Sequence, residues 1–363
     1  MYLKRLKFQQ TKYSKSAESI FHSDRLRALV TPMFPEEEYV GIERKYSWKC
    51  NTCNTVFEDH LMFGKVPTCP TCYKSNMPYS KVEHEIRNFV RSLGFPEAGS
   101  SREVVSPKEV DIWIPEKRIA IEINGIYWHS EAHGGKDKHY HVFKTKVCDN
   151  KGIQLLQFWD TECREKRAIV ESVIRSKLGL PNRRIHARKC TVRYVSNECA
   201  HRFFEDNHLQ GKGTYSKRLG LFIEEELVAL IGMSKARYGN KHDWELVRFA
   251  SVLNTQVVGG LSKLIAAFRK DHKGSIVTYA DRRISNGKAY TEVGFTYSHT
   301  TTPNYWYTHK PKLYSQLVSR VGFQKHKLRE KKSYSAKLTE WQIMQLEGYD
   351  RVWDCGNEVF VLD

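Results

Sequence analysis

The sequence predicts a multidomain protein that combines α/β and α+β parts. Its 363 residues are too many for one ordinary core, since a domain contains on the order of 150 residues. Two CxxC pairs near the front are typical of a small metal-stabilised module. Behind them, segments with helical periodicity alternate with short strand-like segments, which predicts mixed sheets covered by helices.

The composition indicates a globular protein with an excess of positive charge. Hydrophobic residues make up 40% of the chain and charged residues 28%, and no apolar run approaches the length of a membrane span. Residues 1–15 are basic without a following apolar stretch, so we expect an N-terminal arm and a cytoplasmic location without a membrane partner. The formal net charge of +18 favours nucleic acid as partner, although solubility alone would also explain it.

Four cysteines near the front have the spacing of a zinc site. They form two CxxC pairs separated by fifteen residues: Cys50, Cys53, Cys69 and Cys72. Each CxxC turn directs two thiolates at one point, and four thiolates complete the tetrahedral shell that Zn²⁺ prefers. Two disulfides are the alternative, but a chain in the reducing cytoplasm would keep these cysteines as thiols. Because a four-thiolate shell has no open position, we expect a structural zinc ion in a zinc ribbon.

A helix over about residues 80–93 is predicted next, because apolar residues recur at helical spacing and Gly94 follows. Glu83 flanks the apolar stripe, so its carboxylate can point toward whatever the helix packs against. With Ser80, Glu83 also fits an S-x-x-E capping box, which would explain this residue without catalysis.

Two alternating segments, 109–114 and 118–124, are joined by a short turn and predict a β-hairpin. Counting back from the turn places Asp111 directly opposite Glu122, on the face away from the isoleucines. Opposed residues have Cβ atoms about 4.5–5.5 Å apart, so two like charges are unfavourable there unless a cation lies between them. The pairing predicts a metal site, whereas a solvated face would explain both acids without one.

The chain leaves this hairpin at Asn124 and brings His129 just past its end. A helix over about 136–151 carries Asp137 and His141, which would share one face by their i, i+4 spacing. His129 would then lie within reach of a water molecule at the acids. Asp137, His141 or both would orient that water or His129.

An apolar strand over 153–159 and a helix to Leu178 complete the order α-β-β-α-β-α. The segment from about 80 to 178 resembles the EDxHD homing endonucleases of phages and the very-short-patch repair endonuclease, members of the PD-(D/E)xK nuclease superfamily. The resemblance is carried by Glu83, Asp111, Asn124 at the variable position, His129 after Trp128, and Tyr140-His141 before Gly152.

The resemblance implies Mg²⁺-dependent hydrolysis of double-stranded DNA in an infected host cell. It implies that Asp111 is the principal metal ligand and that His129 is the base near the water, while Glu122 matches the second acid. Two departures stand out: Asn124 occupies the usual lysine position, and the last acid falls on His141, for which Asp137 is the substitute. Metal-assisted hydrolysis does not demand that lysine, so cleavage is still expected.

From about residue 183 the pattern changes to short strands at 191–195, 218–223, 227–233, 245–249 and 276–279. This half resembles the GNAT-like C-terminal domain of many phage homing endonucleases and, more distantly, phage DNA-modifying acyltransferases. The matching segments are 245–249, 257–260 with Ser262 and Lys263, 279–283 and 303–306. The acyltransferase loop pattern departs at Leu261, and Gly259 and Gly260 would serve packing equally well.

Residues 310–332 form a basic segment, which favours contacts with DNA phosphates over a merely solvated face. Its charged residues are Lys310, Lys312, Arg320, Lys325, Lys327, Arg329, Lys331 and Lys332 against Glu330. The closing segment 349–363 is expected to form a hairpin. The predicted domains are a basic arm and helix (1–40), the zinc ribbon (41–78), the nuclease domain (79–180), the GNAT-like domain (183–309) and a basic helical segment with the hairpin (310–363).

Taken together, these features predict a site-specific DNA endonuclease. A mismatch-repair nicking enzyme would use the same chemistry but would not need the long second half. An acyltransferase centred on 259–263 with an inactive nuclease part, and a zinc-containing DNA-binding protein without catalysis, are alternatives from other classes. The oligomeric state, the target site, and nicking versus double-strand cleavage stay open.

Overall fold

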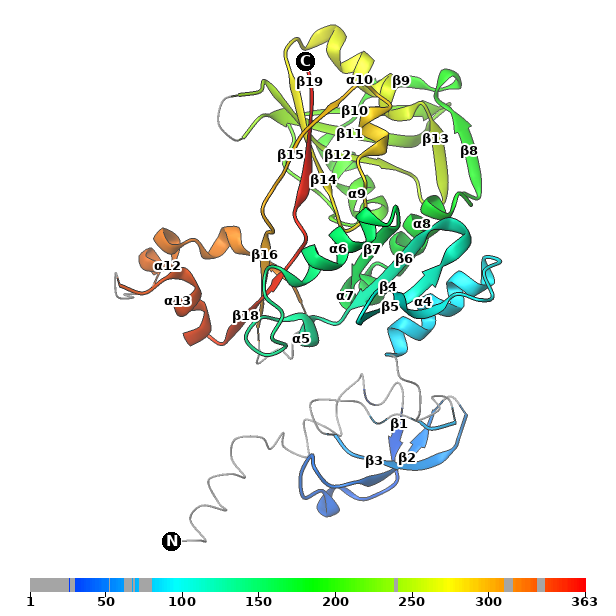
Figure 1. Cartoon of the computed structure of the whole chain (residues 1–363), viewed down its shortest axis with the longest axis vertical. Coiled ribbons are helices and arrows are strands. Elements are labelled where there is room, and N and C mark those ends of the chain that lie inside the picture. The colour runs from blue at the N-terminus through cyan, green and yellow to red at the C-terminus, as the bar shows by residue number, and fades with distance from the viewer. Residues whose placement is uncertain are drawn as a thin grey trace. The chain divides into compact units, whose positions relative to one another are not determined.

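The chain is a mixed α/β multidomain protein with several sheets (Figure 1). A computed structural model describes residues 26, 30–51, 53–61, 67, 69–71, 80–237, 241–309, 316–331 and 337–363. It divides into two compact units, Met1–Lys81 and Val82–Asp363. No helix in these ranges is long and apolar enough to cross a membrane. Most of the predicted N-terminal arm lies outside the described residues.

The first unit contains a three-stranded antiparallel sheet of order β1-β2-β3, formed by Val30–Pro32, Tyr46–Cys50 and Val56–Asp59. Trp48 is fully buried at its centre and donates its indole N–H to the Asp59 carbonyl oxygen at 3.1 Å. The core around it is small and includes Cys50 and Cys69. A core of this size gains stability from a cross-link or a metal ion.

The second unit begins with a four-stranded mixed sheet of order β4-β5-β6-β7. Its elements are α4 (Lys81–Ser92), β4 (Gly99–Val105), β5 (Lys108–Ile114), β6 (Ile119–Asn124), α5 (Ile126–His129), α6 (Tyr140–Asn150), β7 (Gln154–Trp159), α7 (Asp160–Glu165) and α8 (Arg167–Leu178). Strands β6 and β7 are parallel and the other neighbours antiparallel. The predicted element order omitted β4, because this edge strand is mostly polar and has no apolar alternation.

The hairpin register agrees with the sequence-based count. Ile112 pairs with Ile121 and Ile114 with Ile119, and the next step places Asp111 opposite Glu122. The isoleucines belong to one hydrophobic cluster with residues of α4 and α8. Strand β6 is buried along its whole length, so Glu122 does not lie on a solvated face.

A seven-stranded sheet of order β15-β19-β14-β12-β11-β10-β9 dominates the rest of the unit, and only β12 and β14 pair in parallel. Its strands are β9 (Thr191–Tyr194), β10 (Lys217–Ile223), β11 (Glu226–Lys235), β12 (Trp244–Ser251), β14 (Ile276–Asp281), β15 (Thr296–Thr300) and β19 (Asn357–Leu362). The five predicted strands of this half are confirmed within a few residues. Strands β8 (Arg183–His186) and β13 (Thr255–Val258) form a separate parallel pair.

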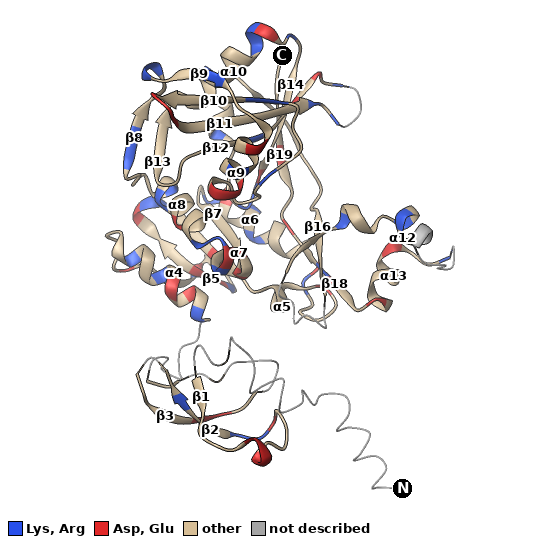
Figure 2. Ribbon diagram, turned by 180° about the vertical axis from the view of Figure 1, so that it is seen from behind, with Lys and Arg blue, Asp and Glu red and all other residues tan. Residues whose placement is uncertain are grey.

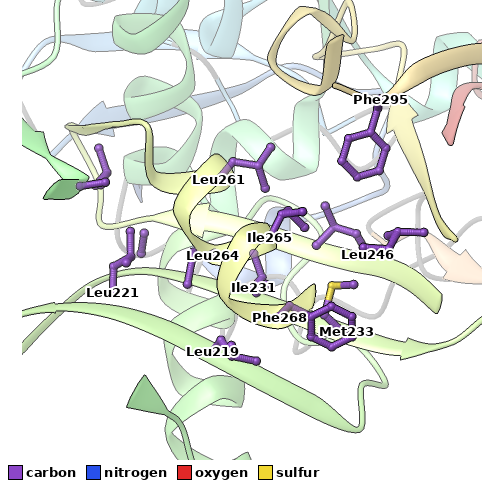
Figure 3. Close-up of a cluster of buried hydrophobic side chains, with 14 of the residues drawn as sticks. Leu219, Leu221, Ile231, Met233, Leu246, Leu261, Leu264, Ile265, Phe268 and Phe295 are labelled. Carbon is purple, nitrogen blue, oxygen red and sulfur yellow. The ribbon is translucent and has the colours of Figure 1, made fainter. Parts of the chain in front are cut away.

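Helix α10 (Gly260–Asp271) covers one face of the large sheet, and α9 (Asn197–Asn207) contacts β11 and β12. Leu261, Leu264, Ile265 and Phe268 of α10 point toward the apolar side chains of the strands (Figure 3). This spacing of three and four residues explains why the helix forms here.

The closing segment 349–363 does not form the predicted hairpin. Strand β18 (Tyr349–Trp353) pairs with β16 (Tyr305–His309) in a small sheet completed by β17 (Val318–Ser319), whereas β19 inserts between β14 and β15. The chain changes sheets at Gly356, whose φ of +79° and closeness to the Thr301 carbonyl oxygen leave no room for a side chain.

Short helices α11 (Lys288–Thr291), α12 (Lys325–Lys331) and α13 (Glu340–Leu346) complete the unit. Of the predicted basic segment, Lys310, Lys312 and Lys332 lie outside the described residues. Lys and Arg are visible on α12 and also on β8, far from it in the sequence (Figure 2).

Candidate functional site

The predicted acids lie on the face of the four-stranded sheet that α6 contributes to covering. The site includes four polar side chains with little exposure: Glu122 (3%), Asn124 (1%), His141 (2%) and Lys144 (4%). Polar groups with so little access to water are expensive unless they are paired or hold a ligand. Each of these side chains therefore needs a hydrogen-bond partner, a counter-charge or a ligand.

The two acids are held in an environment that disfavours negative charge. The Asp111 carboxylate accepts a hydrogen bond from the Ile123 backbone N–H at 2.7 Å, and burial raises its pKa. Burial, together with the neighbouring Asp111 carboxylate, raises the pKa of Glu122 to about 8. A bound cation would favour ionisation of both groups.

Lys144 of α6 is a buried member of the candidate site that the sequence did not single out. Its Nζ atom lies 2.6 Å from Oε1 of Glu122 and donates a second bond to the Glu109 carbonyl oxygen at 2.8 Å. Burial opposes the charge on Lys144, but Glu122, Tyr140 and Asp111 together outweigh it and raise the pKa of the ammonium group. A signal was available, because Lys144 follows His141 by three residues and therefore shares its helix face.

His129 and His141 form a hydrogen-bonded pair beside the acids. Nδ1 of His129 lies 3.3 Å from Nε2 of His141, and Nδ1 of His141 lies 2.9 Å from Oε1 of Gln157. Burial lowers the pKa of His141 to about 4 and that of His129 to about 2, so both rings are neutral near pH 7.

This pairing fixes the tautomers of both rings. The Gln157 amide donates through Nε2 to Thr145 at 2.9 Å, so its Oε1 atom must accept from Nδ1–H of His141. Nε2 of the neutral His141 ring is then an acceptor, and Nδ1 of His129 donates to it. The remaining nitrogen of His129, Nε2, is left unprotonated and able to accept a proton.

Asn124 has unsatisfied polar atoms at the end of β6. Neither Oδ1 nor Nδ2 has a hydrogen-bond partner among the residues that the structure describes. Leaving a buried polar group unpaired costs about 1–3 kcal/mol. An oxygen atom in this state, on the same strand face as Glu122, is suited to a bound ligand or ion.

Glu83 is linked to the site through Arg87. Its carboxylate lies 2.5 Å from Nη2 of Arg87, and the same guanidinium nitrogen donates to the Asp111 backbone oxygen at 2.8 Å. Glu83 therefore holds the residue that fixes the strand at Asp111.

Asp137 does not share a helix face with His141, so that prediction was wrong. Helix α6 begins at Tyr140, and Asp137 lies exposed in the preceding turn. Its carboxylate accepts from the His139 backbone N–H at 3.0 Å, a turn-forming role typical of aspartate. Of the two candidates for the last catalytic position, His141 is the one in contact with His129.

The loop that follows His129 is held by β18 from the far end of the chain. The fully buried Asp350 accepts hydrogen bonds from the backbone N–H groups of Ala132 at 2.9 Å and His133 at 3.1 Å. Arg351 forms an ion pair with Glu131, with Nη2 to Oε1 at 2.9 Å. No sequence pattern links residues so far apart, which is why sequence analysis could not find this contact.

Three of the predicted zinc ligands lie together in the first unit. The Sγ atoms of Cys50, Cys53 and Cys69 all lie within 4.8 Å of one another. None of the three forms a disulfide, and the sulfurs of Cys53 and Cys69 are 3.5 Å apart. Cys72 lies outside the described residues. The three thiols could bind a metal ion such as zinc.

The sequence matches no protein-family model and shows no significant similarity to a curated protein. The protein is thus defined by its architecture, a mixed α/β multidomain chain, and by two polar features: the thiol cluster and the buried site around Asp111.

Proposed function

We propose that this protein is a metal-dependent DNA endonuclease of the EDxHD type, within the PD-(D/E)xK superfamily. The observation that carries the proposal is the opposed pair of a half-buried Asp111 and a buried Glu122, on the sheet face where α6 also carries the neutral ring of His141. Two carboxylates side by side with little access to water are costly unless cations balance both charges. Lys144 pairs with Glu122, and a divalent cation between the two acids would balance the second charge.

The residues present fit a magnesium ion. Mg²⁺ prefers carboxylate and carbonyl oxygens, which Asp111, Glu122 and Asn124 supply from adjacent strands. The Asn124 oxygen lacks a partner in the described part of the chain, and burial raises the pKa of both acids, an effect that a bound metal ion would oppose. When bound, the metal would stabilise charge on a scissile phosphate and lower the pKa of a water molecule.

The chain's own residues would supply the other roles. His129 would be the base: its Nε2 atom is unprotonated, and the negative charge of a bound phosphate beside it would raise the low pKa of the ring. His141 and Gln157 keep His129 in that tautomer. In the superfamily, a lysine at the position of Asn124 usually provides a positive charge. In this chain Lys144 of α6 would provide that charge, and its ammonium group contacts Glu122.

We also propose a role for each domain of the chain. Cys72 would complete a structural Zn²⁺ site with the three clustered cysteines in a ribbon over 41–78, and residues 79–180 would form the nuclease domain. Residues 183–309 would form a GNAT-like domain, and 310–363 a basic segment that contacts double-stranded DNA in the cytoplasm of an infected cell.

A plasmid assay tests the proposal. The purified full-length protein should convert supercoiled DNA to nicked or linear products with Mg²⁺, stop when a chelator is added, and recover when Mg²⁺ is restored. Cleavage that ignores the chelator, or no cleavage of any DNA supplied, would contradict it. Mapping the cut sites separates a site-specific enzyme from a mismatch-repair nicking enzyme, which would cut only mispaired DNA.

A second candidate function is acyl transfer. A cavity of about 370 Å³ at the start of α10 is lined by Gly259, Ser262 and Lys263, together with His186 and Arg188. Against this function, the Lys263 ammonium already donates to the carbonyl oxygens of Ala187 at 3.0 Å and Cys190 at 2.6 Å. Calorimetric titration with acetyl-CoA decides the question, since the absence of heat removes this function.

A further inference from the structure

A second polar cleft lies at the opposite end of β6 from the candidate site. It has a volume of about 530 Å³ and is formed by the start of β6 and β7, the ends of α6 and α8, and the loop after β14. Its lining residue on β6 is Ile119, three residues before Glu122 and so roughly 10 Å away at 3.3 Å per residue. The lining includes Thr145, which accepts a hydrogen bond from Gln157, but none of the acids and histidines of the candidate site.

The cleft contains more positive than negative charge. Its lining includes four cationic side chains, Lys117, Arg118, Lys177 and Arg282, and two carboxylates, Asp149 and Glu358. Both carboxylates are taken up by Arg282, which lies 2.9 Å from Asp149 and 4.0 Å from Glu358. The other three cations have no carboxylate of their own within the lining.

Arg118 and Lys177 contribute most of this unbalanced charge. Arg118 donates Nε to the Gly152 carbonyl oxygen at 3.2 Å and Nη2 to that of Lys151, so neutral groups orient it without cancelling its charge. Lys177 has neither a hydrogen bond nor an ion pair with any residue that the structure describes. Burial lowers the pKa of Lys177 to about 8, as expected for an ammonium group without a counter-charge.

We propose that this cleft binds the phosphate group of a small phosphorylated molecule. Cations that line one cleft and lack a carboxylate partner are stabilised by a multivalent anion, and Lys and Arg are the usual phosphate ligands. The volume matches that of small-molecule sites, which range over about 300–1,000 Å³. The lining contains no aromatic residue, so the phosphate and not a stacked base is the recognised group. This inference does not depend on the nuclease proposal.

Isothermal titration of the full-length protein with inorganic pyrophosphate tests the inference. We expect saturable binding that weakens at least tenfold in Lys177→Met. Lys146→Met removes the same charge from an exposed position of α6 outside the cleft, and should bind like the wild type. Arg118→Asn, which retains a residue tolerant of the positive φ of 52°, provides a second variant if Lys177→Met does not fold.

Two results would overturn the proposal. One is the absence of saturable pyrophosphate binding. The other is equal weakening by Lys177→Met and Lys146→Met, which would reveal general attraction of anions to a basic protein.

A short DNA duplex distinguishes the source of the phosphate. If Lys177→Met weakens binding of pyrophosphate but not of the duplex, the ligand is a free small molecule, as we expect because Lys177 is partly buried. Equal losses for both ligands would assign the cleft to a phosphate of the DNA backbone and overturn the small-molecule assignment.

Discussion

At the residue scale, the ammonium group of Lys144 balances the negative charge of an ionised Glu122 in the candidate site. Both side chains are buried and their atoms lie 2.6 Å apart. Breaking such a pair leaves one uncompensated charge, at a cost of about 3–5 kcal/mol. At pH 9, above the pKa of Glu122 of about 8, Lys144→Met should therefore lower the free energy of unfolding by about 3 kcal/mol in urea titrations, and Glu122→Gln in the same chain should restore part of it. A loss below about 1 kcal/mol in the single variant would show that the pair is not buried as described.

The buried histidines predict how stability depends on pH. The pKa of His141 is lowered to about 4, whereas an unfolded histidine titrates near 6.5. The unfolded state thus binds more protons between these values, and stability falls as pH drops below about 6.5. His141→Gln removes this term, which is worth roughly 2 kcal/mol at pH 5.

Urea midpoints at pH 7 and pH 5 measure this effect. The wild type should lose more stability over this interval than His141→Gln does. Equal losses in both proteins would mean that His141 is accessible to protons in the folded state.

At the element scale, the residue pattern determined which strands and helices could be predicted. The alternation in β5 and β6 and the three-residue turn were sufficient to give the register, and with it the opposition of Asp111 and Glu122. The polar edge strand β4 and the separation of β18 from β19 were not predictable, because both depend on neighbours distant in sequence. Asp137 was misplaced because a turn aspartate and a helical one look alike in the sequence.

Strand β18 predicts a long-range effect on the candidate site. Asp350→Asn should weaken the two hydrogen bonds to the Ala132 and His133 amides, so that these amides exchange with solvent faster. If the proposed function holds, the cleavage rate should fall about tenfold with little change in KM. The loop that follows His129 would be displaced, whereas the DNA contacts would be unchanged.

Asp354→Asn is the matched control. Asp354 also accepts hydrogen bonds from two backbone N–H groups, those of Asn304 and Gly356, but these do not belong to the loop that follows His129. Unchanged exchange of Ala132 and His133 in Asp350→Asn, or equal acceleration in both variants, would contradict the positioning role.

At the scale of the whole molecule, the two units should respond separately to metal removal. One zinc ion per chain is expected by elemental analysis, held by the clustered thiolates of Cys50, Cys53 and Cys69 with Cys72. A chelator should unfold the first unit, because its core is small, and leave the second unit folded. Cys69→Ser should lose the zinc. Full zinc retention in that variant, or a protein purified without zinc, would contradict the assignment.

The sequence indicated single residues of the candidate site better than it indicated the contacts between distant segments that hold them. Hairpin spacing predicted that Asp111 and Glu122 oppose each other, in agreement with the observed register, whereas Asn124 was named from the resemblance and the roles of His129 and His141 stay predictions. Lys144 was seen only as part of a helix, and the contacts of Asp350 and the cleft around Lys177 arise from packing of distant segments. Local periodicity describes single elements, whereas these contacts depend on how the elements fold together.

The cleavage rate of Asp111→Asn decides whether the Asp111 carboxylate holds the catalytic metal. This substitution keeps the size of the side chain but removes the charge that would hold the metal, whereas Glu116→Gln removes an exposed acid from the turn of the same hairpin. With saturating Mg²⁺ and supercoiled plasmid, we predict a loss of about 100-fold or more for Asp111→Asn and wild-type activity for Glu116→Gln. Wild-type cleavage by Asp111→Asn would contradict the account.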